Sequence, residues 1–189
     1  LECGAEICGI GLQPNTDPSL FNLLDLENRI QSHILDIRDL QNVKRIFDEF
    51  KPEIVFHLAA QPLVIDSYKN PVYTFDVNVI GTVNILECIR SNPCVTSFVN
   101  VTTDKVYENQ EQENYGYVET DRLNGYDPYS NSKSCSELVT ASYCKSFFSD
   151  RDFAVSTCRA GNVIGGGDFS ENRIVPDCIK YTVKTIPII

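Results

Sequence analysis

KPEIVFHLAAQPLV, residues 51–64, holds the pattern that decides the fold, a short apolar run followed at once by small and polar residues. The run Ile54–Leu58 is nearly continuous in apolar side chains, as expected for a strand buried on both faces of a parallel sheet. Ala59, Ala60 and Gln61 follow it directly. Ligands of such a sheet lie beyond the carboxyl ends of its strands, so this stretch predicts a strand and one wall of a binding site.

Four further strand-like runs repeat this arrangement, with helical patterns between them. The strand-like runs are Glu6–Leu12, Ser32–Ile37, Thr96–Val101 and Phe153–Arg159. The helical patterns are Asp39–Phe50, Val72–Ile89, Ser130–Phe147 and Ile174–Val183, the first with Asp39 as its expected N-cap. Alternation of strands and helices over this length predicts an α/β protein with a doubly wound parallel sheet, the Rossmann arrangement.

Composition narrows the classes of partner. The 189 residues are 42% hydrophobic and 22% charged, as in a globular protein, and their net charge is −10. This acidity argues against a nucleic-acid surface, which needs clustered Lys and Arg. We expect no membrane segment either, because no apolar run approaches the ~20 residues of a span. The eight cysteines include no C-x-x-C pair, which favours reduced core residues of a cytoplasmic protein over a metal site.

Polar and ionisable residues also follow the last two predicted strands. TTDKVY, residues 102–107, comes after the fourth run, and AGNVIGGGD, residues 160–168, comes after the fifth. The carboxyl ends of parallel strands meet at one edge of a sheet. We therefore expect these residues to gather beside Leu58–Gln61 at a single site.

YDPYSNSK, residues 126–133, adds a pair of side chains suited to proton transfer. Tyr129 and Lys133 are four residues apart and share one face of a helix, which Asp127–Pro128 would begin. A tyrosine has an ordinary pKa near ~10, and a neighbouring ammonium lowers that pKa by stabilising the phenolate. The pair taken alone is also compatible with an ordinary helix surface. Its place after TTDK favours a catalytic role.

With NVIGTVNILE (residues 78–87), GYDPYSNSKSCSELVTASY (125–143) and RAGNVIGGGDFSENRIVPD (159–177), these motifs give the chain a family resemblance. Along essentially its whole length it resembles the NAD-dependent nucleotide-sugar epimerase/dehydratase family, which belongs to the extended short-chain dehydrogenases/reductases. Within that family the resemblance is closest to 4,6-dehydratases, with CDP-glucose as the expected substrate. Lys105 follows Asp104 directly, where dTDP-glucose dehydratases typically have Asp–Glu.

The resemblance implies roles for individual residues. The implied catalytic residues are Asn78, Thr103, Asp104 (the general acid), Lys105 (its variable partner), Tyr129 and Lys133. The implied NAD contacts are Asp36 and Ile37 at the close of a strand, Leu58, Ala59, Ala60 and Gln61 in the loop after the next strand, and Tyr129 and Lys133. The implied substrate contacts are Asn162 and Arg173. No metal is implied.

Two departures from the family pattern shape these expectations. The G-x-x-G-x-x-G phosphate loop is absent from the sequence, as is methionine. We therefore expect a chain truncated at both ends, with residues 1–164 as a partial NAD-binding Rossmann domain and 165–189 as the start of the substrate-binding region. Such a chain alone is expected to bind NAD poorly and to be inactive. Gln13 stands where an acidic residue often holds the ribose hydroxyls, but NAD remains favoured over NADP.

The implied reaction is dehydration of a nucleotide-activated hexose to its 4-keto-6-deoxy form, by oxidation at C4, loss of water across C5 and C6, and return of the hydride. Whether Lys105 acts as a base at C5 or as a cation stays open. Alternatives are a nucleotide-sugar 4-epimerase, a dehydratase of dTDP-glucose or GDP-mannose, a non-catalytic dinucleotide sensor and an inactive remnant. The two long helices, Val72–Ile89 and Ser130–Phe147, resemble those that pair across a two-fold axis in this family, which implies a homodimer.

Overall fold

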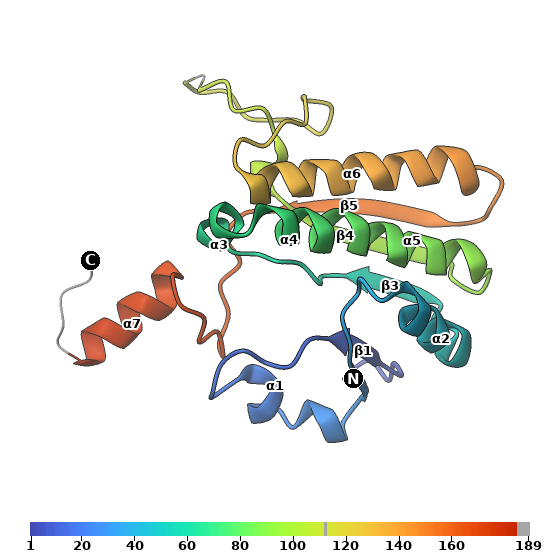
Figure 1. The fold of residues 1–189 in the computed structure, drawn as a ribbon, viewed down its shortest axis with the longest axis horizontal. Coiled ribbons are helices and arrows are strands. Elements are labelled where there is room, and N and C mark those ends of the chain that lie inside the picture. The colour runs from blue at the N-terminus through green and yellow to red at the C-terminus, as the bar shows by residue number, and fades with distance from the viewer. Residues whose placement is uncertain (112, 185–189) are drawn as a thin grey trace. The chain divides into compact units, whose positions relative to one another are not determined.

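The computed structural model describes residues 1–111 and 113–184 (Figure 1). The chain forms two compact units. One unit comprises Leu1–Leu35 and the described residues from Asn162 onward, and the other comprises Asp36–Gly161.

The smaller unit is built on two short parallel strands. Strand β1, Cys8–Gly11, pairs with β2, Gln31–Ile34, with Cys8 opposite Gln31. Two short helical segments connect these strands, α1 (Leu20–Leu23) and the 3₁₀ turn Leu26–Asn28. Helix α7, Ile174–Lys184, also belongs to this unit.

The second strand was predicted to extend to Ile37, but it ends three residues earlier. Strand β2 ends at Ile34, so Asp36 and Ile37 follow the strand rather than close it. The Asp36 carboxylate accepts a hydrogen bond from the backbone N–H of Arg38, and its carbonyl accepts one from Asp39. These bonds turn the chain toward the next helix, and a local turn of this kind competes successfully with strand pairing.

The larger unit contains a three-stranded parallel sheet in the order β3-β4-β5. The strands are β3 (Ile54–His57), β4 (Ser97–Thr103) and β5 (Ala154–Ala160). The register runs to Thr103 opposite Ala160, so the carboxyl ends of β4 and β5 are level. The parallel α/β arrangement expected from the sequence is confirmed in both units.

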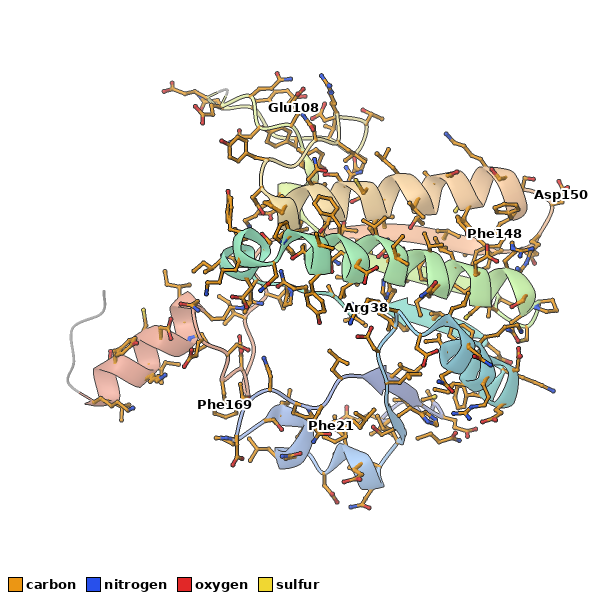
Figure 2. The ribbon with its side chains drawn as sticks, in the orientation of Figure 1. Phe21, Arg38, Glu108, Phe148, Asp150 and Phe169 are labelled. Atoms are coloured by element: carbon orange, nitrogen blue, oxygen red, sulfur yellow. The ribbon has the colours of Figure 1, made fainter. Side chains whose placement is uncertain are left out.

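Helices cover one face of this sheet (Figure 1). The short helix α3, Val64–Lys69, follows β3, and helix α6, Pro128–Phe147, packs against β4 and α5. Helix α2, Leu40–Phe50, packs against α5, and Asp39 caps it by accepting a hydrogen bond from Asn42, as predicted. The core between these elements contains Val43, Phe47, Leu86, Ile89, Val95 and Phe98. Figure 2 shows Phe148 and Asp150 at the end of α6 that lies away from the loop of Glu108.

The expected helix over Val72–Ile89 is observed with an interruption. Helix α4 (Pro71–Phe75) leads into a π-helical segment, Asp76–Ile80, and this continues as α5 (Gly81–Ser91). By length and composition this 21-residue stretch could also cross a membrane, contrary to expectation, but 56% of the relevant window is buried. It therefore has the character of a core helix of this unit.

The cysteines are less buried than expected. Cys88 is buried in the core, whereas Cys3 and Cys158 are exposed and the other five are intermediate. Side chains alternate between the two faces of a strand. The neighbouring Arg159 bonds to Glu137 of α6, so Cys158 points to the opposite, uncovered face of the sheet. All eight cysteines are free thiols.

Candidate active site

The larger unit contains all the residues predicted to act in catalysis and in binding NAD. They come from the turn after β2, the loop after β3, the π-helical segment, the end of β4 and the start of α6. Hydrogen bonds join residues of these segments that lie 17 and 54 positions apart in the sequence.

Helix α6 begins as predicted at the Tyr129–Lys133 pair. Asp127 is its N-cap and accepts a hydrogen bond from the backbone N–H of Ser130 at 3.0 Å, while Pro128 occupies the first turn. Pro at this position has the φ that a helix start needs, and its missing N–H would have had no partner there. Tyr129 lies half-buried in the first turn and Lys133 one turn later.

Lys133 is a buried cation. Its side chain is 5% exposed, and Nζ donates to the carbonyl oxygen of Val101 on β4 at 3.0 Å. Burial removes water from the ammonium and lowers the pKa of Lys133 to about 8, although the nearby Glu137 carboxylate acts in the opposite direction. A positive charge held one turn from Tyr129 is the arrangement that lowers a phenol pKa.

Asn78 ties three segments of the site together. Its Oδ1 accepts from the backbone N–H of Gln61 at 2.8 Å, and its Nδ2 donates to the Gln61 carbonyl at 3.1 Å and to Ser132 Oγ at 2.9 Å. Ser132 in turn donates to the carbonyl of Tyr129. These contacts position the loop after β3 relative to the start of α6. The predicted role of Asn78 in holding Lys133 stays a prediction.

A buried polar network continues from Asn78 beneath the site. Thr82 Oγ1 donates to the Asn78 carbonyl at 2.7 Å and lies 3.1 Å from His57 Nε2 and 3.0 Å from Ser136 Oγ. Burial, with a smaller contribution from the Lys133 charge, lowers the pKa of His57 to about 3. His57 is therefore a neutral imidazole at physiological pH. From the sequence, His57 was predicted only to lie within a strand, with no further role.

The Asp104–Lys105 pair occupies a 3₁₀ turn, Asp104–Val106, directly after β4. Thr103 is the N-cap of this turn, and its hydroxyl donates to Asp104 Oδ1 at 3.1 Å. Lys105 Nζ lies 3.0 Å from the same oxygen. Both charged side chains remain about half exposed, so they are accessible to a ligand. Gly161 lies beside the Asp104 carboxylate, where an added Cβ would be 3.5 Å from Oδ2.

Of the four residues predicted to contact NAD in the loop after β3, Leu58 alone is exposed, and the backbone of the loop is held by hydrogen bonds. Leu58 is 66% exposed, whereas Ala59 and Ala60 are intermediate. Gln61 is buried. Its side-chain Nε2 donates to Thr74 Oγ1, and its side-chain Oε1 accepts from the backbone N–H of Leu63 at 2.6 Å. The Gln61 side chain thus holds the loop in place, and the predicted NAD contacts of the four residues stay predictions.

Arg38 was not singled out from the sequence, yet it organises the segment that follows β2. Arg38 is labelled in Figure 2. Its guanidinium binds both carboxylate oxygens of Asp36 at 2.8 to 3.1 Å, binds Asp76 at 2.9 Å and lies over the Tyr73 ring. The guanidinium lowers the pKa of Asp36 below its usual range. Ile37 is buried with its side chain beside Gly81, where an added Cβ would be 2.4 Å from Cδ1.

The two predicted substrate contacts, Asn162 and Arg173, lie in the other unit. Arg173 Nε is buried and has no hydrogen-bond partner among the described residues. Their roles stay predictions.

The buried ion pair between Glu137 and Arg159 was also missed. Glu137 comes four residues after Lys133, so the tyrosine, the lysine and the glutamate recur at one helical spacing. That spacing could have indicated that Glu137 points in the same direction as Lys133. Nothing in the local pattern indicated that Arg159 of β5 would meet it.

These motifs and this fold define a known class of protein. Residues 13–179 match the GDP-mannose 4,6 dehydratase family, and the chain belongs to that family. It is 46% identical over 184 residues to CDP-glucose 4,6-dehydratase of Salmonella typhimurium, an alignment that covers 95% of this chain and 51% of that protein. The chain thus spans about half the length of this relative.

Solved structures show the same fold. UDP-glucose 4-epimerase of Thermus thermophilus, in complex with NAD, is 29% identical with a TM-score of 0.73, over 85% of this chain and 50% of that one. A double mutant of dTDP-glucose 4,6-dehydratase from Streptomyces venezuelae, with NAD bound, is 22% identical with a TM-score of 0.80, over 96% and 54% of the two chains.

Proposed function

We propose that the complete protein containing this chain is an NAD-dependent 4,6-dehydratase of a nucleotide-activated hexose, with CDP-glucose as its substrate. The observation that carries the proposal is the presence of two separate proton-transfer pairs in one unit, Tyr129 with Lys133 and Asp104 with Lys105. The 46% identity with a CDP-glucose 4,6-dehydratase supports the choice of substrate.

The residues present fit NAD in two respects. Leu58 and the small residues Ala59 and Ala60 leave the loop at the end of β3 accessible, and Asn78 holds the backbone of Gln61 there. Arg38 fixes the orientation of the Asp36 carboxylate, which is suited to accept a hydrogen bond from an adenine amine. When bound, NAD accepts a hydride from the sugar and later returns it. The Arg173 donor that lacks a partner would suit a nucleotide phosphate.

Tyr129 would act first, by taking the proton of the C4 hydroxyl as the C4 carbon is oxidised. A phenol is a weak base, and a buried ammonium one helical turn away, that of Lys133, would stabilise the phenolate of Tyr129. The hydroxyl of Thr103, fixed beside Asp104, would lie near the C4 oxygen. The resulting ketone acidifies the proton at C5.

Asp104 would act second, by donating a proton to the hydroxyl that leaves C6 as water. The Lys105 ammonium forms an ion pair with Asp104, with Nζ 3.0 Å from Oδ1. This supports the interpretation of Lys105 as a cation that stabilises the developing enolate rather than as a neutral base at C5. If Lys105 keeps its proton, another base must accept the proton from C5. If Lys105 passes its proton to Asp104, the neutral amine accepts the C5 proton and Asp104 carries the proton that the C6 hydroxyl takes up.

The decisive experiment is incubation of the complete protein with NAD and CDP-glucose, dTDP-glucose or GDP-mannose in parallel. We expect the alkali-induced absorbance of a 4-keto-6-deoxy product, and we expect it to be strongest with CDP-glucose. A product from dTDP-glucose alone or from GDP-mannose alone would contradict CDP-glucose as the substrate but would support the dehydratase reaction. No 4-keto-6-deoxy product from any of them would contradict the dehydratase proposal.

A 4-epimerase is the second candidate, supported by the 29% identity with an epimerase of the same fold. An epimerase needs Tyr129 and Lys133 but has no use for an acid directed at C6. The same incubations separate the two, because an epimerase would invert C4 without loss of water.

We also infer a cytoplasmic homodimer that forms through the long helices. Val72, Leu138 and Phe147 are 82%, 55% and 51% exposed on α4 and α6, and exposed apolar side chains of this kind are suited to contact with a second copy. Leu86 of α5 is fully buried in the core and is not available for such a contact. Light scattering of the complete protein at micromolar concentration should give twice the monomer mass. The free thiols agree with a reducing compartment.

A further inference from the structure

A buried ion pair joins the helix of Lys133 to strand β5. The side chains of Glu137 and Arg159 are 4% and 14% exposed, and Arg159 Nη2 donates to Glu137 Oε2 at 2.6 Å. Arg159 Nε lies 2.9 and 3.0 Å from the two carboxylate oxygens. Thr102 of β4 donates to Glu137 Oε1 at 2.6 Å. The guanidinium is thus held in one orientation by two of its N–H groups, Nε–H and one on Nη2.

The opposite edge of the same guanidinium reaches the segment that follows the Asp104–Lys105 turn. Arg159 Nη1 donates to the hydroxyl oxygen of Tyr107 at 2.9 Å and to the carbonyl of Glu119 at 3.1 Å. Its Cζ atom lies 4.8 Å from the centre of the Tyr107 ring. Because a guanidinium is planar and its donors form a rigid fork, the orientation set by Glu137 also determines where Tyr107 lies.

The turn is anchored at its last residue, Val106, which is fully buried and whose carbonyl accepts hydrogen bonds from Ser134 Oγ of α6 at 2.7 Å and from Asn124 N–H at 2.9 Å. Its two charged residues have fewer anchors. The side chains of Asp104 and Lys105 are about half exposed, and their hydrogen bonds are to each other and to Thr103. Tyr107 follows this three-residue turn at once and forms a single antiparallel bridge with Leu123. Val106 and Tyr107 are therefore the two anchors at the end of the turn, and the direction of Asp104 and Lys105 depends in part on how firmly Tyr107 is held.

We propose that Arg159 is a positioning residue for the Asp104–Lys105 pair. Glu137 orients Arg159 from the helix that also carries Lys133, and Arg159 holds Tyr107 and thereby the turn. The two proton-transfer pairs are in this way fixed relative to each other through Glu137 and Arg159. This inference rests on the proposed dehydratase function, because it assigns different reaction steps to the two pairs.

The main test compares Tyr107→Phe with Tyr117→Phe in the complete protein. Tyr107→Phe removes only the hydroxyl that Arg159 binds and keeps the ring under the guanidinium. Tyr117 stacks on Tyr107 in the same loop, and its hydroxyl bonds to Asn109 and to the backbone of Gln110 rather than to Arg159. The two variants are therefore matched in chemistry and location but differ in the contact of interest.

Each variant is incubated with NAD and CDP-glucose in deuterated water, and reduced cofactor, deuterium at C5 and product are followed. We expect Tyr107→Phe to slow C5 exchange and product formation roughly tenfold, the effect of one lost hydrogen bond to a charged group, while C4 oxidation changes less than twofold. Reduced cofactor should then accumulate. Tyr117→Phe should leave all three rates within twofold of wild type.

Equal slowing of all three steps by Tyr107→Phe would overturn the proposal, because it would indicate a general structural role. Unchanged rates would overturn it as well. A second variant, Glu137→Gln with Arg159→Gln, removes both partners of the ion pair together, so that neither is left unpaired. Because the Glu137 carboxylate also raises the pKa of Lys133, this variant is compared with wild type well below pH 8, where Lys133 keeps its charge. C5 exchange and product formation should again slow more than C4 oxidation, and by a larger factor than in Tyr107→Phe. Equal slowing of all three steps would count against the proposal.

The wild-type reaction separates failure of this inference from failure of the proposed function. If wild type forms no 4-keto-6-deoxy product, the function is wrong, and hydrogen exchange of residues 104–111 still tests the anchoring. Tyr107→Phe should then raise exchange in this segment by about tenfold over Tyr117→Phe. Equal protection in the two variants would show that Arg159 does not hold the turn.

Discussion

The two proton-transfer pairs of this unit are held in very different ways. Tyr129 and Lys133 sit on the first turns of a 20-residue helix, over a network of buried hydrogen bonds, and Lys133 is almost fully enclosed. Asp104 and Lys105 sit on a three-residue turn, half exposed, and bond chiefly to each other. The first pair is preorganised by burial, whereas the second takes its position from neighbours such as Tyr107. The pair proposed to start the reaction is therefore the less adaptable of the two.

The largest effect should come from the buried pair. Tyr129→Phe in the complete protein removes the base for the first proton transfer, so C4 oxidation should fall by roughly 10⁴, the upper end of general-base effects. No reduced NAD should accumulate with CDP-glucose. Absorbance of the reduced cofactor during a single turnover measures this step. Turnover near the wild-type rate would mean that YDPYSNSK is only a helix start.

Asp104→Asn should act later and somewhat less severely. The amide cannot donate the proton that leaving water needs, and product formation should fall by ~10²–10⁴. C4 oxidation and C5 deuterium exchange should persist, because both precede departure of water. Mass spectrometry of the recovered sugar nucleotide measures the exchange. If C5 exchange disappears as completely as product, Asp104 acts before elimination and its division of roles with Lys105 is wrong.

The burial of Lys133 sets the pH range of the first step. The pKa of Lys133 is lowered to about 8, so its charge is lost as pH rises through that value. The rate of C4 oxidation should then decrease up to tenfold per pH unit above about 8. Stopped-flow measurement of cofactor reduction between pH 6 and 10 would show this limb. Lys133→Arg, whose guanidinium stays charged, should lower the rate but remove the limb. A limb that persists in this variant would assign the titration to another group.

The smallest effect concerns the stability of the network beneath Lys133. Folded His57 has a pKa of about 3, whereas an unfolded histidine takes up a proton below about 6.5. Protonation therefore favours the unfolded chain, and the free energy of unfolding should decrease as pH falls through 6.5 toward 3. At pH 5.5 the loss is about 1.4 kcal/mol relative to neutral pH.

Urea unfolding of the complete protein at pH 7.5 and 5.5 measures this difference. His57→Gln keeps a donor for Thr82 and has no charge to gain, so it should reduce the loss by about 1.4 kcal/mol. His33, which is half-buried on β2, supplies the matched control through His33→Gln. Equal losses in the wild type and in His57→Gln would show that His57 does not account for the acid sensitivity.

Local patterns were sufficient where neighbours in sequence create the structure. Asp39 and Asp127 were recognisable as helix caps because a cap is a contact between residues three apart. The end of β2 was misjudged because Asp36 forms a turn with Arg38, a competition that an apolar pattern does not reveal. The π-helical segment at Asn78 was equally invisible, since its side chain bonds to Gln61 and Ser132, 17 and 54 residues away.

The sequence by itself determined the parallel α/β class, the helix that presents Tyr129 and Lys133 on one face, and the order of the polar loops. These depend on the periods of strand and helix, which are properties of consecutive residues. Only the tertiary structure decided that Lys133 is buried, that His57 stays neutral, and that Arg159 connects Glu137 to Tyr107. Burial and long-range ion pairing depend on which segments pack together, and a pattern along the chain does not contain that information.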